Sequence, residues 1–269
     1  MPKRGLSEQK PVITATYGHY CGPWEWEGPQ DDEKKYVKEL MAERGYEMLL
    51  PDIPVSDPDI TLDEQAKAIV AAEQERGAPE YVRWGHSFGG DLIYRELGST
   101  PVSMLVFQAS PLRPVLKRLG LPIPLGDQGI RYAAYVAAEI RGQVDFEGSR
   151  EDLGEYMFSD LGSAALSGWA TSKIQPHPHR INHTTDRNSS AENDKNAELP
   201  QTLPMHYVSF ENDTIFHYPG QQLTARKLGL EFSSIRTCHF PMLEKPDLFV
   251  DCMIRLIEDR KAERRQALE

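Results

Sequence analysis

The chain has 269 residues, of which 39% are hydrophobic and 26% charged, a composition typical of a soluble globular protein large enough for one α/β domain. The 30 Lys and Arg against 41 Asp and Glu give a net charge of −11 without a basic stripe, which argues against nucleic-acid and anionic-membrane partners. No run approaches the roughly 18 apolar residues of a membrane span. The polar N-terminus shows no apolar signal segment, and the three cysteines lack C-x-x-C spacing. We therefore expect a cytoplasmic protein.

Strands and helices alternate through the first 110 residues. Short β-prone runs predict strands at residues 12–16, 47–50, 81–84 and 102–107. Apolar residues at helical spacing predict helices at residues 31–44, 61–76 and 91–97. This alternation predicts right-handed crossovers and a parallel sheet that is covered on both faces.

The pattern changes after Ala109 and then resumes. Residues 111–200 contain no clear strand, only helical patches at 131–141, 150–158 and 162–170 followed by a polar stretch. Strands are expected again at 206–210 and 231–236, with helices at 221–228 and 246–260. We predict an α/β fold with a doubly wound, mostly parallel sheet, formed by residues 1–110 and 201–269, and an inserted helical cap at 111–200. The cap would lie over the crevice where such sheets bind ligands.

A glycine-flanked serine lies between the third strand and the next helix. Gly85-His86-Ser87-Phe88-Gly89 matches G-x-S-x-G in the strand–turn–helix context of a nucleophile elbow. The sharp turn leaves no room for side chains two residues before or after the serine, which explains the glycines. The motif alone occurs by chance in about one chain in ten of this length, so its context carries the prediction that Ser87 projects from the sheet beside a helix N-terminus.

A serine hydroxyl needs a base that removes its proton and an acid that orients the base. Of the eight histidines, His239 follows the final predicted strand and precedes the final helix, which is the position of the general base in this architecture. Asp213 follows the preceding strand and would emerge at the same edge of the sheet. Glu211 is the alternative acid. We predict a triad of Ser87, Asp213 and His239.

Acyl transfer also needs hydrogen-bond donors for the developing oxyanion. The backbone N–H of Phe88 is one candidate. The other is the Gly18–His19 peptide in the loop after the first strand, where Gly18 permits close approach of the substrate. The chain carries no phosphate-binding glycine motif after a strand. We therefore expect a small-molecule substrate and no nucleotide or other cofactor.

Histidines occur at residues 177, 179 and 183 in the polar stretch. A proline separates the first two, and no set of cysteines or carboxylates completes a tetrahedron, so no metal is expected. Several apolar cap residues suggest either a substrate pocket or ordinary core packing: Tyr132, Tyr135, Phe158, Leu161 and Trp169. Nothing in the sequence indicates an oligomeric state.

These residues resemble the α/β-hydrolase superfamily and, within it, the small single-domain group of plant methylesterases, hydroxynitrile lyases and related bacterial hydrolases. Residues 17–26, Y-G-H-Y-C-G-P-W-E-W, resemble the group's H-G-x-x-x-G-x-W-x-W loop. Residues 51–54, 207–216 and 239–243 resemble its P-D-L-P segment and the segments that carry its acid and its base. The resemblance implies the same triad of Ser87, Asp213 and His239, with the N–H groups of His19 and Phe88 as the oxyanion hole.

The chain departs from this group at three positions. Tyr17 stands in place of the loop histidine, and the hydroxynitrile lyases carry a threonine and a lysine where this chain has Gly18 and Phe240. The groups that handle cyanohydrins are thus missing, which favours hydrolysis. We predict a carboxylesterase-like serine hydrolase that acts on a carboxylic ester, lactone or thioester. Carbon–carbon bond hydrolysis, perhydrolysis and a non-turnover small-molecule receptor are the alternatives.

Overall fold

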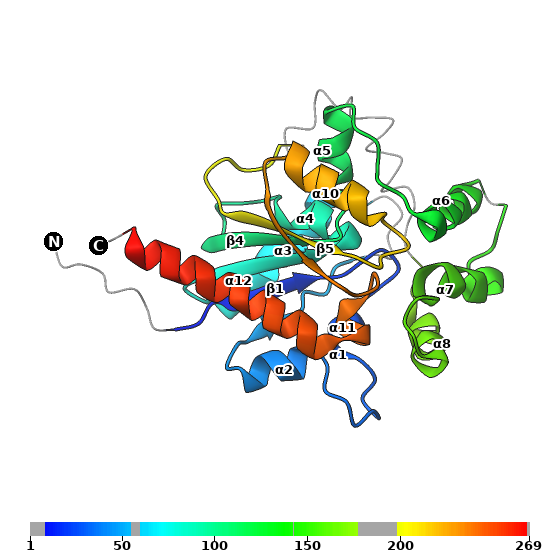
Figure 1. Cartoon of the computed structure of the whole chain (residues 1–269), viewed down its shortest axis with the longest axis horizontal. Helices are drawn as coiled ribbons and strands as arrows, with labels where there is room; N and C mark the ends of the chain where they lie inside the picture. The colour runs from blue at the N-terminus through cyan, green and yellow to red at the C-terminus, as the bar shows by residue number, and fades with distance from the viewer. Residues whose placement is uncertain (1–8, 55–59, 142, 177–197, 268–269) are drawn as a thin grey trace.

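A six-stranded, all-parallel sheet forms the centre of the protein, with the strand order β2-β1-β3-β4-β5-β6 (Figure 1). This computed structural model describes residues 9–54, 60–141, 143–176 and 198–267. The strands are β1 Val12–Thr16, β2 Met48–Leu49, β3 Tyr81–His86, β4 Val102–Gln108, β5 Met205–Phe210 and β6 Glu231–Ile235. All six lie where the sequence predicts a strand, so the predicted α/β class with a parallel sheet is confirmed.

The neighbouring strands β1 and β3 are buried along their whole length, as expected for a parallel sheet covered on both faces. On one face, Leu105 and Phe107 of β4 share a core cluster with Ile93 of the short helix that follows the elbow. On the other face, the ring of Trp84 in β3 packs edge-on against Phe249 of the C-terminal helix, with centroids 6.0 Å apart. The two faces of the sheet thus bury separate sets of side chains. The candidate residues predicted from the sequence lie at the ends of the strands.

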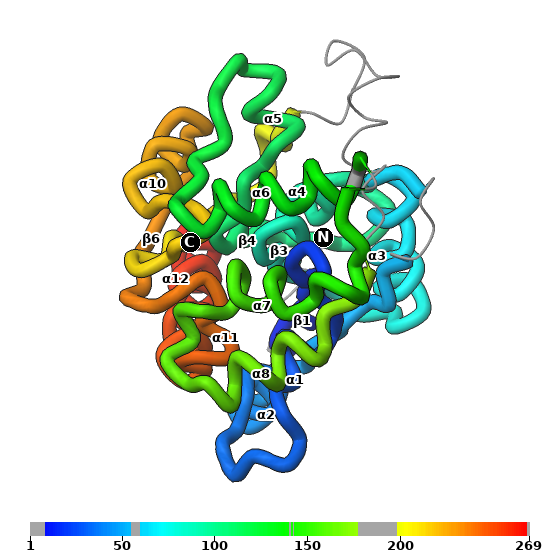
Figure 2. The backbone as a smooth tube through the Cα atoms, turned by 90° about the vertical axis from the view of Figure 1, so that its right-hand side faces the viewer, coloured from blue at the N-terminus to red at the C-terminus, as the bar shows by residue number. Residues whose placement is uncertain are grey.

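Helices flank the sheet and extend beyond one end of it. Before β5 they are α1 Trp24–Glu27, α2 Val37–Glu43, α3 Leu62–Arg76, α4 Gly90–Ile93, α5 Arg113–Arg118, α6 Asp127–Ile140, α7 Arg150–Phe158 and α8 Ala164–Lys173. After β5 they are α10 Tyr218–Lys227, α11 Pro241–Glu244 and α12 Pro246–Gln266. Helices α6, α7 and α8 lie together at the end of the sheet toward which β1 points, and Figure 2 shows them in front of β1, β3 and β4. They are therefore placed to cover the carboxyl ends of these strands.

Local sequence explains where α3 begins, and two other helices are shorter than predicted. Thr61 and Glu64 form a capping box at the start of α3. The helix predicted at 31–44 begins only at Val37, because Asp32 instead accepts the Lys34 N–H in a turn. The helix predicted at 91–97 ends at Ile93. With so few turns, its dipole contributes less at the elbow than the sequence prediction assumed.

The early end of α4 follows from a buried arginine in β3. Arg83 is fully buried and donates to the carbonyl oxygens of Ile93 and Arg95, at 3.1 and 3.0 Å. Its guanidinium also forms two hydrogen bonds with Glu73 of α3, at 2.9 and 2.7 Å. Both carbonyls thus accept from the guanidinium instead of from a backbone N–H group of a further helical turn. Arg83 thereby joins β3, α3 and the segment after the elbow.

The remaining differences concern short helices and the C-terminal helix. Residues 24–27 and 241–244 form the single-turn helices α1 and α11, and 113–118 form α5, none of which the sequence predicts because each is too short for helical periodicity. Helix α12 continues to Gln266 instead of residue 260. Within the described ranges, no helix is long and apolar enough to cross a membrane. The cytoplasmic location stays a prediction.

Candidate active site

The elbow holds Ser87 in a left-handed backbone conformation at the end of β3. Its φ is +48°, a value that costs about 1–3 kcal/mol in a non-glycine residue and is typical of functional turns. A Cβ atom at Gly85 would lie 2.6 Å from Gly90 Cα, and one at Gly89 would lie 2.5 Å from Thr16 Oγ1. Both glycines are therefore required by close backbone approach, as the sequence predicts.

The structure brings Asp213 and His239 together at the carboxyl ends of β5 and β6. Asp213 Oδ2 lies 2.7 Å from His239 Nδ1, and both side chains are buried. The other carboxylate oxygen, Oδ1, accepts the backbone N–H groups of Ile215 and Phe216, each at 2.8 Å. Since Asp213 accepts a hydrogen bond from the Nδ1–H group, the Nε2 atom of His239 is the nitrogen that remains to accept a proton from a nucleophile.

Gln221 of α10 completes the support of this carboxylate. Its fully buried amide Nε2 donates to Asp213 Oδ2 at 3.0 Å and to the Phe216 carbonyl at 2.6 Å, and its Oε1 accepts the Phe210 N–H at 3.2 Å. Every polar atom of the amide thus has a fixed partner. The sequence gives no sign of this role, because Gln221 lies eight residues after Asp213 in an ordinary helical pattern. The alternative acid, Glu211, is exposed and accepts a hydrogen bond from Ser234 at 2.9 Å.

Burial and charge act in opposite directions on His239. Burial lowers the pKa of the imidazole, but the charge and the hydrogen bond of Asp213 outweigh it, so the pKa is raised above 6.5. Asp160, in the connection between α7 and α8, also raises the pKa of His239. Burial in turn raises the pKa of the Asp160 carboxyl, which accepts a hydrogen bond from Thr214 at 2.9 Å. A residue of the predicted cap therefore lies within the electrostatic range of the candidate base.

Ser87 adjoins His239 through the residue that precedes it. The imidazole rings of His86 and His239 have centroids 4.7 Å apart, and His86 Nε2 lies 2.9 Å from the His239 carbonyl oxygen. In the described structure no hydrogen bond joins the Ser87 hydroxyl to His239. Catalytic hydrogen bonds are often long before substrate binds and tighten in the complex. The pairing of Ser87 with His239 stays a prediction.

The loop after β1 lies against the elbow. A Cβ atom at Gly18 would lie 3.4 Å from Ser87 Cβ, and the rings of His19 and Phe88 have centroids 5.6 Å apart. The structure thus places the loop that carries one predicted oxyanion donor, His19, against the elbow that carries the other, Phe88; their function as donors stays a prediction. Tyr17 fixes this loop, because its hydroxyl donates to the Ile53 carbonyl at 3.2 Å and accepts the Ile53 N–H at 3.1 Å.

The cap contacts the same loop through aromatic side chains. Tyr132 of α6 forms a hydrogen bond with His19 Nδ1, and the Tyr20 hydroxyl donates to Glu139 at 2.7 Å. The ring of Trp24 packs edge-on against Trp169 with centroids 5.6 Å apart. Tyr135, Phe158 and Leu161 are buried in the core cluster. Of the two interpretations of the apolar cap residues, a substrate pocket or core packing, core packing fits these three.

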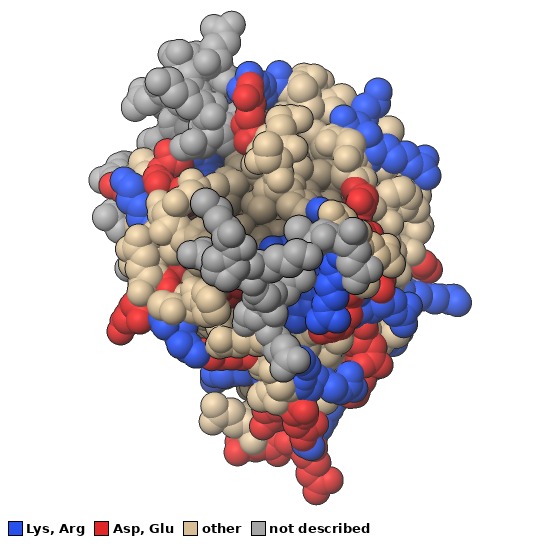
Figure 3. All heavy atoms as spheres, turned by 90° about the vertical axis from the view of Figure 1, so that its left-hand side faces the viewer, with Lys and Arg blue, Asp and Glu red and all other residues tan. Residues whose placement is uncertain are grey.

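Candidate metal ligands do not cluster in the part of the chain that is described. No group of three or more His, Cys, Asp or Glu gathers there to hold a metal ion. The histidines at 177, 179 and 183 lie outside the described residues. On the face shown in Figure 3, Lys and Arg are interspersed with Asp and Glu.

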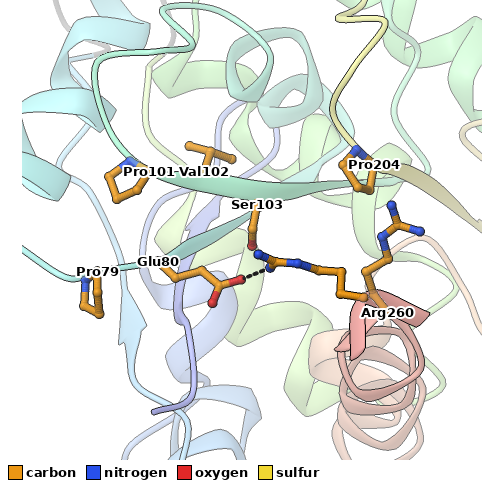
Figure 4. Close-up of a pocket in the computed structure, with 8 residues that line it drawn as sticks. Pro79, Glu80, Pro101, Val102, Ser103, Pro204 and Arg260 are labelled. Atoms are coloured by element: carbon orange, nitrogen blue, oxygen red, sulfur yellow. Dashed lines mark hydrogen bonds and ion pairs between the residues drawn. The ribbon is translucent and has the colours of Figure 1, made fainter. Parts of the chain in front are cut away.

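A hollow of about 440 Å³ lies at the end of the strands opposite to Ser87 (Figure 4). Its lining includes Glu80, Pro101 and Pro204, the residues just before β3, β4 and β5. Glu80 pairs there with Arg264 at 2.7 Å. The hollow is therefore at the amino ends of the strands, away from the triad residues, and is not the candidate active site.

The chain is similar to known proteins in structure and not in sequence. No protein-family model matches the chain, and no curated protein sequence matches it. Solved structures do match. The esterase EaEST from Exiguobacterium antarcticum has a TM-score of 0.68 and 16% identity over 93% of this chain and 92% of that one. The methylesterase MES16 from Arabidopsis has a TM-score of 0.64 and 13% identity over 93% and 99%.

A third match is a pyrethroid hydrolase from Sphingobium faniae, with a TM-score of 0.65 and 15% identity over 92% of this chain and 97% of that one. At these identities, structural similarity establishes the fold and not the reaction. The protein has the α/β-hydrolase fold, and the fold predicted from the sequence motifs is confirmed.

Proposed function

We propose that the protein is a serine hydrolase that cleaves an ester-type small molecule through an acyl-enzyme on Ser87. The observation that carries the proposal is the 2.7 Å contact between Asp213 and His239, beside a strained serine. A buried imidazole held by a carboxylate with all its oxygens engaged has one tautomer available, the one that can activate a hydroxyl. The structurally similar proteins named as esterases and hydrolases add support.

In the proposed reaction, His239 Nε2 removes the Ser87 proton as the serine oxygen attacks the carbonyl carbon. The backbone N–H groups of Phe88 and His19 stabilise the oxyanion of the tetrahedral intermediate. The imidazolium then gives its proton to the leaving alcohol, which leaves an acyl group on Ser87. A water molecule, activated by the same histidine, hydrolyses this ester, and Asp213 stabilises the imidazolium in both steps.

Phe240 supports hydrolysis over lyase chemistry. The residue after the candidate base is fully buried, and its ring packs against Phe158 of the cap with centroids 4.8 Å apart. A buried phenyl ring cannot supply the positive charge that a lysine at this position would offer to a leaving anion. We therefore favour ester, lactone or thioester substrates, with water as the second substrate. Carbon–carbon bond hydrolysis and perhydrolysis remain the alternatives on the same triad.

The test is hydrolysis of p-nitrophenyl esters of increasing acyl length by the wild type and by Ser87→Ala. We expect wild-type turnover on at least one ester and a loss of about 10³- to 10⁶-fold in kcat for the variant, because the nucleophile is missing. Ser103→Ala, at the far end of β4, is the matched control and should keep wild-type rates. Equal activity of Ser87→Ala and the wild type would exclude the mechanism. Labelling of Ser87 by a fluorophosphonate without turnover of any ester would favour the receptor alternative.

A further inference from the structure

Glu25 and His86 form a second carboxylate–imidazole contact, outside the predicted triad, and His86 directly precedes Ser87 in the chain. Both side chains are completely buried, and Glu25 Oε1 lies 2.7 Å from His86 Nδ1. Glu25 belongs to the single-turn helix α1, and His86 is the last residue of β3. The two atoms thus form a close, buried contact that is not a hydrogen bond.

The His239 carbonyl fixes which nitrogen of His86 is the donor. Its Nε2 atom lies 2.9 Å from the His239 carbonyl oxygen, which only accepts, so Nε2 carries a proton. The other ring nitrogen, Nδ1, is therefore the one that faces the Glu25 carboxylate.

The pair connects the two loops on which the proposed reaction depends. The second oxygen of Glu25, Oε2, accepts the backbone N–H of Gly18 at 3.0 Å, one residue before the proposed oxyanion donor His19. At the other end, His86 holds the backbone of His239. The connected groups run from the loop after β1, through Glu25 and His86, to the loop that carries the candidate base.

We propose that Glu25 and His86 are positioning residues that hold the oxyanion loop and the base loop in register around Ser87. The proposal rests on the proposed function. Both loops must be placed to within a fraction of an ångström, because a misplacement of about 1 Å can cost about 100-fold in rate. Apolar residues of similar volume would fill the same space without the desolvation cost of buried polar groups. The two side chains are thus explained by their hydrogen bonds to the loop backbones.

The test uses one disruptive and one conservative variant of Glu25, together with a variant of His86. Glu25→Leu removes both contacts. Glu25→Gln keeps an oxygen for the Gly18 N–H and an amide N–H for His86 Nδ1. His86→Leu removes the other residue of the pair and its hydrogen bond to the His239 carbonyl. Glu27→Leu is the matched control, because Glu27 lies on the same helix and pairs with the exposed Lys38 at 2.7 Å.

We expect Glu25→Leu and His86→Leu to lower kcat on the best p-nitrophenyl ester by about 10- to 100-fold while KM changes by less than about threefold. The double variant should lose no more than either single variant, because the two residues act as one unit. Glu25→Gln should recover most of the loss. The affinity for phenylboronic acid, which mimics the tetrahedral intermediate, should fall in parallel with kcat/KM. Wild-type kcat and boronate affinity in both leucine variants would overturn the proposal.

A measurement on the wild-type protein covers the case in which the leucine variants do not fold. In a ¹H–¹⁵N spectrum of histidine-labelled protein, His86 Nε2 should carry a slowly exchanging proton, and its signal should vanish in His86→Gln. An unprotonated Nε2 would overturn the proposal, since it could not donate to the His239 carbonyl. This spectrum needs no turnover. An unprotonated Nε2 would therefore contradict the positioning proposal alone, whereas absence of ester hydrolysis by the wild type would contradict the proposed function.

Discussion

Replacing Asp213 by asparagine is a sharp test of the triad, because the surrounding groups fix how the new amide must lie. The backbone N–H groups of Ile215 and Phe216 both point at Oδ1, so the amide oxygen has to occupy that position. The amide N–H₂ then takes the place of Oδ2. There it faces the N–H₂ of Gln221, which its other bonds hold in place, and Nδ1 of His239.

The consequence is the wrong tautomer of His239. Nδ1 must present its lone pair to the new amide, so the neutral ring carries its proton on Nε2 and cannot accept the proton of Ser87. The loss expected for this change in a serine triad is about 10⁴-fold in kcat. At 1.36 kcal/mol for each factor of ten, this corresponds to about 5 kcal/mol of transition-state stabilisation.

The assay is kcat on the best p-nitrophenyl ester between pH 5 and 10, with circular dichroism to confirm folding. Glu211→Gln is the matched control, because Glu211 is exposed and bonded to Ser234. It removes the same charge from the same loop and should leave the rate unchanged. If Asp213→Asn kept more than about a tenth of the wild-type kcat, the assignment of Asp213 as the orienting acid would be wrong.

Two further predictions follow from buried charges. A general base acts only when deprotonated, and Asp213 raises the pKa of His239, so kcat/KM of the wild type should rise with pH through a midpoint above 6.5. The residual activity of Asp213→Asn should rise at a lower pH. A wild-type midpoint below 6.5 in the pH–rate profile would contradict the assignment of His239 as the base. Glu73→Gln leaves the buried guanidinium of Arg83 without its counter-charge and should lower the free energy of unfolding by about 3–5 kcal/mol. Urea denaturation checks this loss, with Glu47→Gln in an exposed ion pair as the control that should change little; equal losses in both variants would refute it.

The strands and the positions of the candidate residues could be predicted because each depends on a local pattern. The β-branched run of β1 and the buried runs of β3 and β4 are continuous in sequence, so their ends are found to within two residues. Residues at the carboxyl ends of parallel strands meet by topology alone. This is why Asp213 and His239 could be paired before their contact was known.

The supporting residues could not be predicted, because their roles depend on contacts between distant segments. Gln221 reaches Asp213 only after α10 has packed beside β5. Glu25 lies between two tryptophans and would be expected on the surface, but the fold buries it against Gly18 and His86. Likewise, the early end of α4 depends on Arg83, which no helical pattern reveals.

The central claim is that Ser87 becomes acylated during turnover. The direct measurement is mass spectrometry of the peptide that contains Ser87, after wild-type protein reacting with p-nitrophenyl acetate is quenched in acid. The proposal predicts the added mass of one acetyl group on Ser87 in the wild type and none on this peptide in Ser87→Ala. Steady ester hydrolysis by the wild type with no acetyl group on Ser87, or with the group on another residue, would contradict it.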